Sequence, residues 1–342
     1  MTFMYKMLHM AEKTKKILVT VGIGNYKSED TEAVFKCRDA VVESLRSSGY
    51  TAESFEIHEK VFSKSPETVI SSIKELAPDG VFNLFEGFCG KAGSEAAFAR
   101  MLEESQIPFT GNNSSALELC LDKHRTKEVL SDNGIKVPRG ALVRELSDLD
   151  GLKIDCPVFI KPAFEDASVG IDKRSLAESR EDLVASVTKK LSSFPSGLVV
   201  EEFISGKEFN AAFVGEFPYE HLGISSLDYS HHPDCPNFLN FNSKWKDGAV
   251  EYEKLMPRVL DKKDPDYKNE IVEISRNAAR ALGCSRYFRV DLREKNGELY
   301  VLDVNPNPDI SPDSGLVRQA ASKGIDYTGV VNRILKNIIP GD

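Results

Sequence analysis

Short apolar runs alternate with amphipathic stretches through the first third of the chain. KILVTVG, at 16–22, is a β-branched run ending in glycine and predicts a strand. The pattern then predicts a polar loop, a helix at 39–49, a strand at 52–57, a helix at 66–76 and a buried strand at 80–85. This alternation is typical of a parallel sheet with helices on its faces. Because such sheets bind ligands at the carboxyl ends of their strands, the loops after Val21 and Phe85 are candidate ligand edges.

Beyond 111 the periodicity changes, and strands outnumber helices. We expect a helix from about 121, strands at 157–163 and 197–206 with a helix ending near 191 between them, strands at 210–214, 286–293 and 299–304, and a helix at about 267–282. The loop 164–171 lies between a strand and a helix, as a mobile flap would. We predict three domains: an N-terminal parallel-sheet domain at 1–111, a central flap-bearing domain at 112–201 and a C-terminal domain at 202–342.

Composition narrows the class of protein. The 342 residues are 41% hydrophobic and 28% charged, the balance of a globular protein. The net charge of -9 argues against binding to nucleic acid or to an anionic membrane surface, both of which need clustered Lys and Arg. Six scattered cysteines without a CxxC pair indicate reduced thiols. Neither a signal peptide nor a membrane span is apparent, so we expect a cytoplasmic protein whose first residues, before Lys15, are an extension.

Two lysines are candidates for phosphate binding. Lys123 is predicted at the start of a helix, and Lys161 ends the apolar strand PVFIKP. A buried ammonium group needs an anionic partner, which distinguishes Lys161 from an ordinary solvated lysine. The adjacent loop at 165–170 contains small residues, including Ser168, whose backbone N–H groups can approach phosphate oxygens. Taken alone, this loop could equally be an ordinary connection.

The segment VVEEFISGKEF, at 199–209, suits a nucleoside-binding hinge. Glu201 and Glu202 end a hydrophobic strand, and Ile204 precedes a Ser-Gly turn, so backbone groups here could meet an adenine edge. Glu208 could accept hydrogen bonds from ribose hydroxyls. The alternative is a strand that ends in solvated acids.

The C-terminal hairpin carries a candidate metal site. RVDLR begins at Arg289, and LYVLDVN follows after a turn, so two antiparallel strands present Asp291, Asp303 and Asn305, the last two on one face. Three oxygen ligands without His or Cys suit Mg²⁺, which fills its octahedron with water and phosphate oxygens. A strand bearing solvated acids is the alternative, which the apolar context VLDV disfavours.

The chain resembles the D-alanine–D-alanine ligase branch of the ATP-grasp superfamily from about 16 to 335, and five ordered segments carry the resemblance. They are FNLFEGFCGKAGSEAAFARMLEESQIPFTG, CLDKHRTKEVLSDNGIKVPRG, PVFIKPAFEDASVG, VVEEFISGKEF and RVDLREKNGELYVLDVNPNPDISP. The resemblance implies an α/β ATP-grasp fold, with an N-terminal pre-ATP-grasp domain and two subdomains that clasp ATP. It also implies a ligase that activates a carboxylate as an acyl phosphate for attack by an amine, using ATP and Mg²⁺, or Mn²⁺ in its place.

The resemblance also assigns roles to individual residues. Those matching ATP-binding positions are Lys123, Lys161, Lys244, Ser168, Glu201, Glu202, Ile204 and Glu208, and those matching metal ligands are Asp291, Asp303 and Asn305. Arg289 matches the arginine that stabilises the oxyanion of the tetrahedral intermediate, Ser314 the serine that binds the substrate carboxylate, and Lys244 is also placed among the catalytic groups. The expected partners are small amino acids or peptides and, by family default, a second copy in a homodimer.

Departures from the family pattern concern the substrate pocket. Ala167 replaces a serine, Trp245 a tyrosine and Asp309 a glycine, while GIGNYKSEDTE replaces the family's GxSxEH signature. Asp30 or Glu32 could supply an acid for an incoming amine. Two alternatives therefore stay open. One is a ligase for another amino-acid or peptide pair, such as an L-amino-acid ligase or a natural-product amide synthetase. The other is an inactive ATP-binding regulator, which would not need Arg289.

Two further signals carry less weight. His231, His232, Asp234 and Cys235 in SHHPDCP are metal-ligating types, but immediate neighbours rarely converge on one ion, so a polar loop is the preferred interpretation. Cys89 lies near the predicted ligand edge without an adjacent base, and we do not interpret it as a nucleophile.

Overall fold

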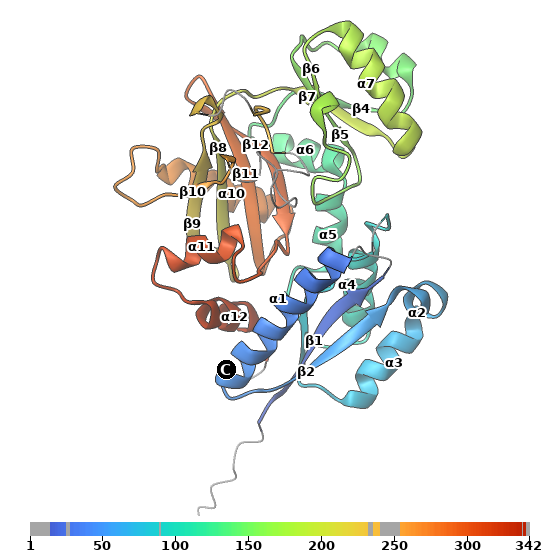
Figure 1. Ribbon diagram of the computed structural model, residues 1–342, viewed down its shortest axis with the longest axis vertical. Coiled ribbons are helices and arrows are strands. Elements are labelled where there is room, and N and C mark those ends of the chain that lie inside the picture. The colour runs from blue at the N-terminus through green and yellow to red at the C-terminus, as the bar shows by residue number, and fades with distance from the viewer. Residues whose placement is uncertain are drawn as a thin grey trace, which may run out of the picture.

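Three sheets, each in its own stretch of the chain, organise the fold (Figure 1). A computed structural model describes residues 14–24, 28–88, 90–231, 235–239, 254–336 and 338–339. In Figure 1 the blue N-terminal part lies at the bottom, the green central part at the upper right and the orange and red C-terminal part at the left. Among the described residues, no helix combines the length and the apolar character that crossing a bilayer would require.

The N-terminal sheet is parallel, as the alternation of apolar runs predicts. Its strands are β1 (Lys16–Ile23), β2 (Thr51–His58) and β3 (Gly80–Asn83), in the order β2-β1-β3, and its helices are α1 (Ser28–Ser47), α2 (Glu59–Lys64), α3 (Pro66–Leu76) and α4 (Ser94–Glu104). Successive side chains of β1 point to opposite faces. Ile17 therefore packs with Val41 of α1, whereas Leu18 packs with Ile73 of α3.

Several helices differ from the predicted pattern, and α1 and α4 are two of them. Helix α1 begins at Ser28, although a polar loop was expected until 38, because residues 28–38 contain neither Gly nor Pro and are acidic at the helix N-terminus. Helix α4 was not predicted. Its buried positions Ala96, Ala99 and Leu102 have helical spacing, so the signal was present in the sequence.

The central sheet is antiparallel and has its own core. Its strands are β4 (Gly140–Val143), β5 (Val158–Pro162), β6 (Leu176–Ala177) and β7 (Leu198–Glu202). Helices α5 (Ser114–Leu121) and α6 (Lys123–Asp132) precede the sheet, and α7 (Arg180–Ser193) and the short 3₁₀ helices η1 (Leu146–Gly151) and η2 (Lys173–Ser175) lie between its strands in the sequence. The strand order is β4-β7-β5-β6. Val158 and Val200 of the sheet pack against Leu183 and Val187 of α7.

The C-terminal sheet has the strand order β10-β9-β8-β11-β12 and is also antiparallel. Its elements are β8 (Glu208–Val214), β9 (Glu220–Leu227), η3 (Tyr229–His231), β10 (Arg258–Val259), α10 (Asn269–Ala281), β11 (Tyr287–Lys295), β12 (Glu298–Pro306), α11 (Gly315–Ala321) and α12 (Tyr327–Leu335). The β11–β12 hairpin contains an irregularity. Asp291 pairs with Asp303 but Leu292 pairs with Val301, so Leu302 is an extra residue in β12.

The N-terminal and C-terminal sheets share a hydrophobic core. Helix α12 crosses back to lie beside α1 (Figure 1), and Val331 and Ile334 belong to the same buried cluster as Ile17 and Val41. The backbone N–H of Asn112 also donates to Asn307 Oδ1 at 2.8 Å, which ties the two parts together. The central sheet, in contrast, has a main core separate from the one that the other two sheets share. The site described next lies where the central sheet meets the C-terminal sheet.

Candidate functional site

The predicted metal-binding side chains lie together on β11 and β12. Asp291 is directly opposite Asp303, and Arg289 is directly opposite Asn305. Asp291 accepts hydrogen bonds from Arg289 at both oxygens, Nε to Oδ1 at 2.7 Å and Nη2 to Oδ2 at 2.8 Å, and from Asn305 Nδ2 at 2.9 Å. Asn210 on the neighbouring strand β8 donates to Oδ1 at 2.8 Å. Burial would lower the pKa of Arg289, but the charge and hydrogen bonds of Asp291, together with the charges of Glu208 and Asp303, raise that pKa above its ordinary range.

Three buried lysines face the Asp303 side of this group. Lys123 Nζ lies 3.7 Å from Asp303 Oδ2, while Lys127 and Lys161 also contribute positive potential there. Burial alone would raise the pKa of Asp303, yet the three ammonium groups lower it, so the carboxylate stays ionised. Oxygen donors and ammonium groups thus lie side by side, the arrangement that a polyphosphate with a hard cation requires.

The irregularity at Leu302 brings a backbone carbonyl to two of these lysines. The Leu302 carbonyl accepts from Lys127 Nζ at 3.0 Å and from Lys161 Nζ at 3.3 Å. Glu201, only 3% exposed, bridges the same pair, with Oε2 at 3.1 Å from Lys127 Nζ and Oε1 at 3.2 Å from Lys161 Nζ. The Oε2 contact is an ion pair without hydrogen-bond alignment. Burial lowers the pKa of Lys127 to about 8, an effect that Glu201 opposes and Lys161 reinforces.

Lys127 was missed by the sequence reasoning, although a signal for it exists. Lys123 and Lys127 are four residues apart in α6, so they emerge on one face of the helix. Both are buried, at 5% and 7% exposure, against the same C-terminal hairpin. Sequence alone could not distinguish a buried lysine in α6 from the exposed ones that most helices carry.

The predicted flap lies against the lysines. Asp166 Oδ1 accepts from Lys123 Nζ at 2.9 Å, and its side chain remains 57% exposed. Ala167 and Ser168 adopt positive φ angles of 51° and 63°, uncommon for non-glycine residues. Lys190 of α7 holds the far end of the loop by donating to the Gly170 carbonyl at 2.6 Å. The loop therefore has a fixed base and an exposed tip whose acid pairs with Lys123.

The predicted hinge after β7 is buried, so its acids are not the solvated strand end considered as the alternative. Glu201 is 3% and Glu208 9% exposed, whereas Glu202 is half-buried and bonded to Lys295. Lys295 is the main cause that lowers the pKa of Glu202, with Arg139 adding to it. The Ile204 carbonyl accepts from Arg293 Nη1 at 2.8 Å.

Aromatic rings that the sequence reasoning did not single out line this hinge. Phe159 of β5 stacks on Phe203 at 6.2 Å and meets the edge of Phe238 at 5.1 Å between ring centroids. These three residues are far apart in the sequence, so only the fold shows that they form one apolar surface.

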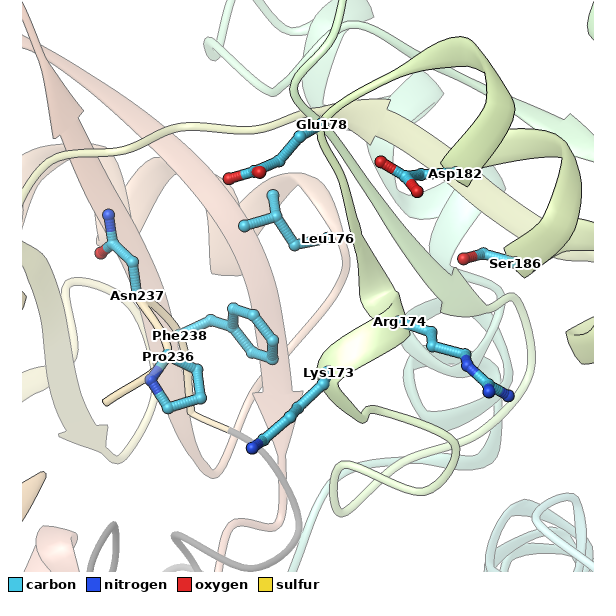
Figure 2. A pocket seen from close by; sticks show the side chains of 9 residues that line it. All are labelled: Lys173, Arg174, Leu176, Glu178, Asp182, Ser186, Pro236, Asn237 and Phe238. Carbon is cyan, nitrogen blue, oxygen red and sulfur yellow. The ribbon is translucent and has the colours of Figure 1, made fainter. Parts of the chain in front are cut away.

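Two cavities flank the segment 236–238 beside the hinge. The first, of about 350 Å³, has Phe238 and Asn237 on one side and residues of β6, η2 and α7 on the other (Figure 2). The second, of about 410 Å³, is lined by the Ser205–Gly206 turn, Lys207 and residues of η3. Asn237 borders both. Neither cavity is lined by the three lysines. The candidate site is therefore the cluster of lysines and carboxylates rather than either cavity.

Comparison with known proteins identifies the family. The family described as "D-ala D-ala ligase C-terminus" matches residues 145–336. The chain belongs to this family. A D-alanine–D-alanine ligase from Marinomonas sp. (strain MWYL1) is 29% identical over 96% of this chain and 98% of its own length, and D-alanine–D-alanine ligase B from Chromobacterium violaceum is 27% identical over 94% and 98%.

Solved structures show the same fold. The VanG D-Ala:D-Ser ligase from Enterococcus faecalis superposes with a TM-score of 0.72 at 20% identity, covering 96% of this chain and 100% of its own. The D-alanine–D-alanine ligase from Bacillus anthracis complexed with ATP gives 0.70 at 22% identity, covering 94% and 97%. The predicted D-alanine–D-alanine ligase-like family, the ATP-grasp fold and the enzyme class, an ATP-dependent C–N ligase, are confirmed.

Not every residue that the sequence of this ligase family member singled out can be placed. Lys244, Trp245, Cys89, His232 and Asp234 lie outside the described residues, as does the side chain of Asp30. Ser314 is described. It is 7% exposed and caps α11, its hydroxyl accepting from the Val317 N–H at 3.3 Å. In the described part of the chain, no group of three or more His, Cys, Asp and Glu is arranged to hold a metal. His231 and Cys235, which are described, therefore belong to no such group.

Sequence reasoning also missed an acidic cluster in this ligase. Burial, the charges of Glu86 and Asp166, and a donor from Asn307 Nδ2 at 2.7 Å act on Glu95, and the net effect raises its pKa to about 8. Desolvation and Asp309 raise the pKa of Glu86 to about 7, although its side chain is solvent-accessible. We define the acidic cluster as Glu86, Glu95 and Asp309. Two of its members come from the N-terminal part and one from the C-terminal part, so chain order conceals it.

Proposed function

We propose that this ligase uses ATP and Mg²⁺ to activate a carboxylate as an acyl phosphate and then joins it to an amine as an amide. One observation supports this above all: Asp291 and Asp303 face each other across the hairpin while Lys123 and Lys161 lie beside them. Asp291, Asp303 and Asn305 are the oxygen donors that would hold Mg²⁺, which when bound neutralises phosphate charge. The same residue types fit Mn²⁺.

In the first step the substrate carboxylate attacks the γ-phosphorus of ATP, and ADP leaves. Lys123 and Lys161 neutralise the charge that spreads over the phosphoryl oxygens. Lys244 is assigned to the same task by the resemblance. The flap at 164–171 closes over the phosphates to exclude water, because an exposed acyl phosphate hydrolyses. Slower amide exchange in 164–171 with ATP and magnesium is the expected result.

In the second step the amine attacks the acyl phosphate, and phosphate leaves as the amide forms. Arg289 donates to the developing oxyanion, and Ser314 binds a substrate carboxylate. Glu201, Glu202 and Ile204 hold adenine, Glu208 the ribose, and the backbone at Ser168 the phosphates. Domain bounds at 111 and 201, a homodimer and a cytoplasmic location remain predictions.

The relatives are named for D-alanine and for the pair D-alanine and D-serine, so we propose small amino acids as substrates. The acidic cluster favours a second candidate within this class, a ligase whose acceptor carries an additional cationic group. A cation bound beside it would lower the raised pKa values of Glu86 and Glu95, so that the carboxylates ionise and compensate its charge. Asp309 stands where the family has glycine, so this carboxylate could make the acceptor specificity of this ligase differ from that of its relatives.

The deciding experiment measures ATP-dependent phosphate release over a matrix of D- and L-amino acids and dipeptides, including basic ones, and identifies the amide by mass. D-alanine alone as the best donor and acceptor would support the family's named reaction. A basic acceptor would support the second candidate. ATP binding without substrate-dependent release or amide would instead support the inactive regulator and refute the proposal.

A further inference from the structure

Arg293 is a buried cation next to the hinge. It is 2% exposed and lies directly opposite Glu208 across β11 and β8. Its guanidinium lies over the rings of Phe203, at 5.3 Å, and Tyr229, at 4.6 Å. Removing a cation from water costs free energy unless its N–H groups find acceptors. The acceptors of Arg293 therefore identify the parts of the protein that it positions.

Those acceptors all belong to the hinge surroundings. Nε and Nη2 donate to Glu208 Oε2 at 3.2 and 3.0 Å. Nη1 donates to the Ile204 carbonyl at 2.8 Å, and Nη2 also donates to the Asn237 carbonyl at 3.0 Å. One planar group therefore fixes the predicted adenine-binding backbone, the predicted ribose-binding acid and the segment that leads to Phe238. A lysine, a point charge on a flexible stem, could not hold three such acceptors in one plane.

The hydrogen bonds to Glu208 are one-sided. The Tyr229 hydroxyl also donates to Oε2, at 2.8 Å, so this oxygen receives three donors. Within the described residues, Oε1 receives no hydrogen bond, and it is not among the buried unpaired atoms. A purely structural ion pair would gain by using both carboxylate oxygens. Here one oxygen is fixed and the other stays accessible to an incoming donor.

We propose that Arg293 is a positioning residue that orients Glu208 Oε1 toward the ribose hydroxyls of ATP and thereby determines how strongly the enzyme prefers ribonucleotides over deoxyribonucleotides. This rests on the proposed function, since it takes Glu208 as the ribose-binding acid. Arg293 itself does not touch the nucleotide. Its effect passes through Glu208, with Tyr229 as the second support of the same oxygen.

The test is equilibrium binding of ATP, 2′-deoxyATP and 3′-deoxyATP, with magnesium, to the wild type and to Arg293→Met, Arg293→Lys and Tyr229→Phe. The wild type is expected to prefer ATP over one or both deoxy forms by about ten-fold, the strength of a hydrogen bond to a charged acceptor. In Arg293→Met the preference should fall toward one, and in the other two variants it should be reduced. Arg276→Met, which removes a half-buried arginine that donates to Glu273 and to the Tyr219 carbonyl, is the control and should keep the wild-type preference.

A merely structural role would lower the fraction of folded protein and leave the ratio of the three affinities unchanged. An unchanged ratio in Arg293→Met, or a wild type with no preference among the three nucleotides, overturns the inference. If Arg293→Met does not fold, the ratios of Arg293→Lys and Tyr229→Phe decide by the same criterion. Failure of the proposed function is distinguishable, because it would appear as absent ATP binding or absent amide formation in the wild type.

Discussion

Arg289 holds Asp291 through two parallel hydrogen bonds, at 2.7 and 2.8 Å. The proposed oxyanion donor and a proposed metal ligand thus neutralise each other before any substrate arrives. A divalent cation arriving at Asp291 would compete with the guanidinium for the same two oxygens. Metal binding would then leave the N–H donors of Arg289 free for the reacting carbonyl. The cation would therefore have to bind before the step that needs Arg289.

Replacing Arg289 with alanine should slow turnover by about 10²–10³-fold, the usual cost of losing one oxyanion donor. ATP affinity should change little, because within the described residues Arg289 donates hydrogen bonds to Asp291 and not to the lysines or to the hinge. Steady-state kinetics and nucleotide titration together measure both effects. Near-normal turnover would remove Arg289 from the mechanism.

Asp291→Asn should raise the magnesium concentration needed for half-maximal activity by about ten-fold or more, since an ionised ligand becomes a neutral one. The fold should persist, because the amide can still accept from Arg289 and Asn210. A magnesium titration at saturating ATP, with circular dichroism as the control, tests this. An unaltered magnesium requirement would place the ion elsewhere.

Asp166→Asn should lower the apparent dissociation constant for ATP by about two- to five-fold. In the ligand-free protein the Asp166 carboxylate occupies Lys123 at 2.9 Å and competes with the phosphates for that cation. The side chain is largely exposed, so the pair is weak and the gain is modest. Glu165→Gln is the matched control on the same loop. Weaker ATP binding in Asp166→Asn would mean that the acid assists rather than competes.

Lys127→Met should destabilise the fold by about 3 kcal/mol, because it leaves Glu201 buried with one cation instead of two. Lys136→Met, which removes a surface pair with Glu298, should change stability little. Urea unfolding of both variants gives the comparison. Equal midpoints would contradict a structural role for Lys127.

Glu95→Gln should remove a pH dependence of stability. In the folded protein the pKa of Glu95 is raised to about 8, from an ordinary value of 4.5, mainly by burial. Between these values the folded state keeps a proton that the unfolded chain has released, so this group's contribution to stability is present below 4.5 and is lost as pH rises through 8. Unfolding midpoints at about pH 5 and about pH 8.5 should differ less in Glu95→Gln than in the wild type. An equal slope in both would show that Glu95 is ionised at neutral pH.

The sequence predicted the main strands and the grouping of acidic side chains on the C-terminal hairpin because both depend on local pattern. β-branched runs marked β1 and β5, and period-two spacing placed Asp303 and Asn305 on one face. Features that depend on long-range contact were not predicted. The partners of Arg293, the ring cluster of Phe159 and Phe238, and the proximity of Glu95 to Asn307 each join segments separated by tens of residues or more. No local periodicity encodes such pairs.

The core shared by α1 and α12 has a practical consequence for engineering this ligase. Val41 of α1 and Ile334 of α12 are buried in one cluster. In a chimaera that exchanged only the first 111 residues, the new α1 would therefore pack against an α12 from the other parent. Transplants of acceptor specificity would have to carry 325–339 along with the N-terminal segment. The central sheet and α7 have a separate main core, whereas Leu130 of α6 packs into the C-terminal core, so α6 would have to stay with the C-terminal part.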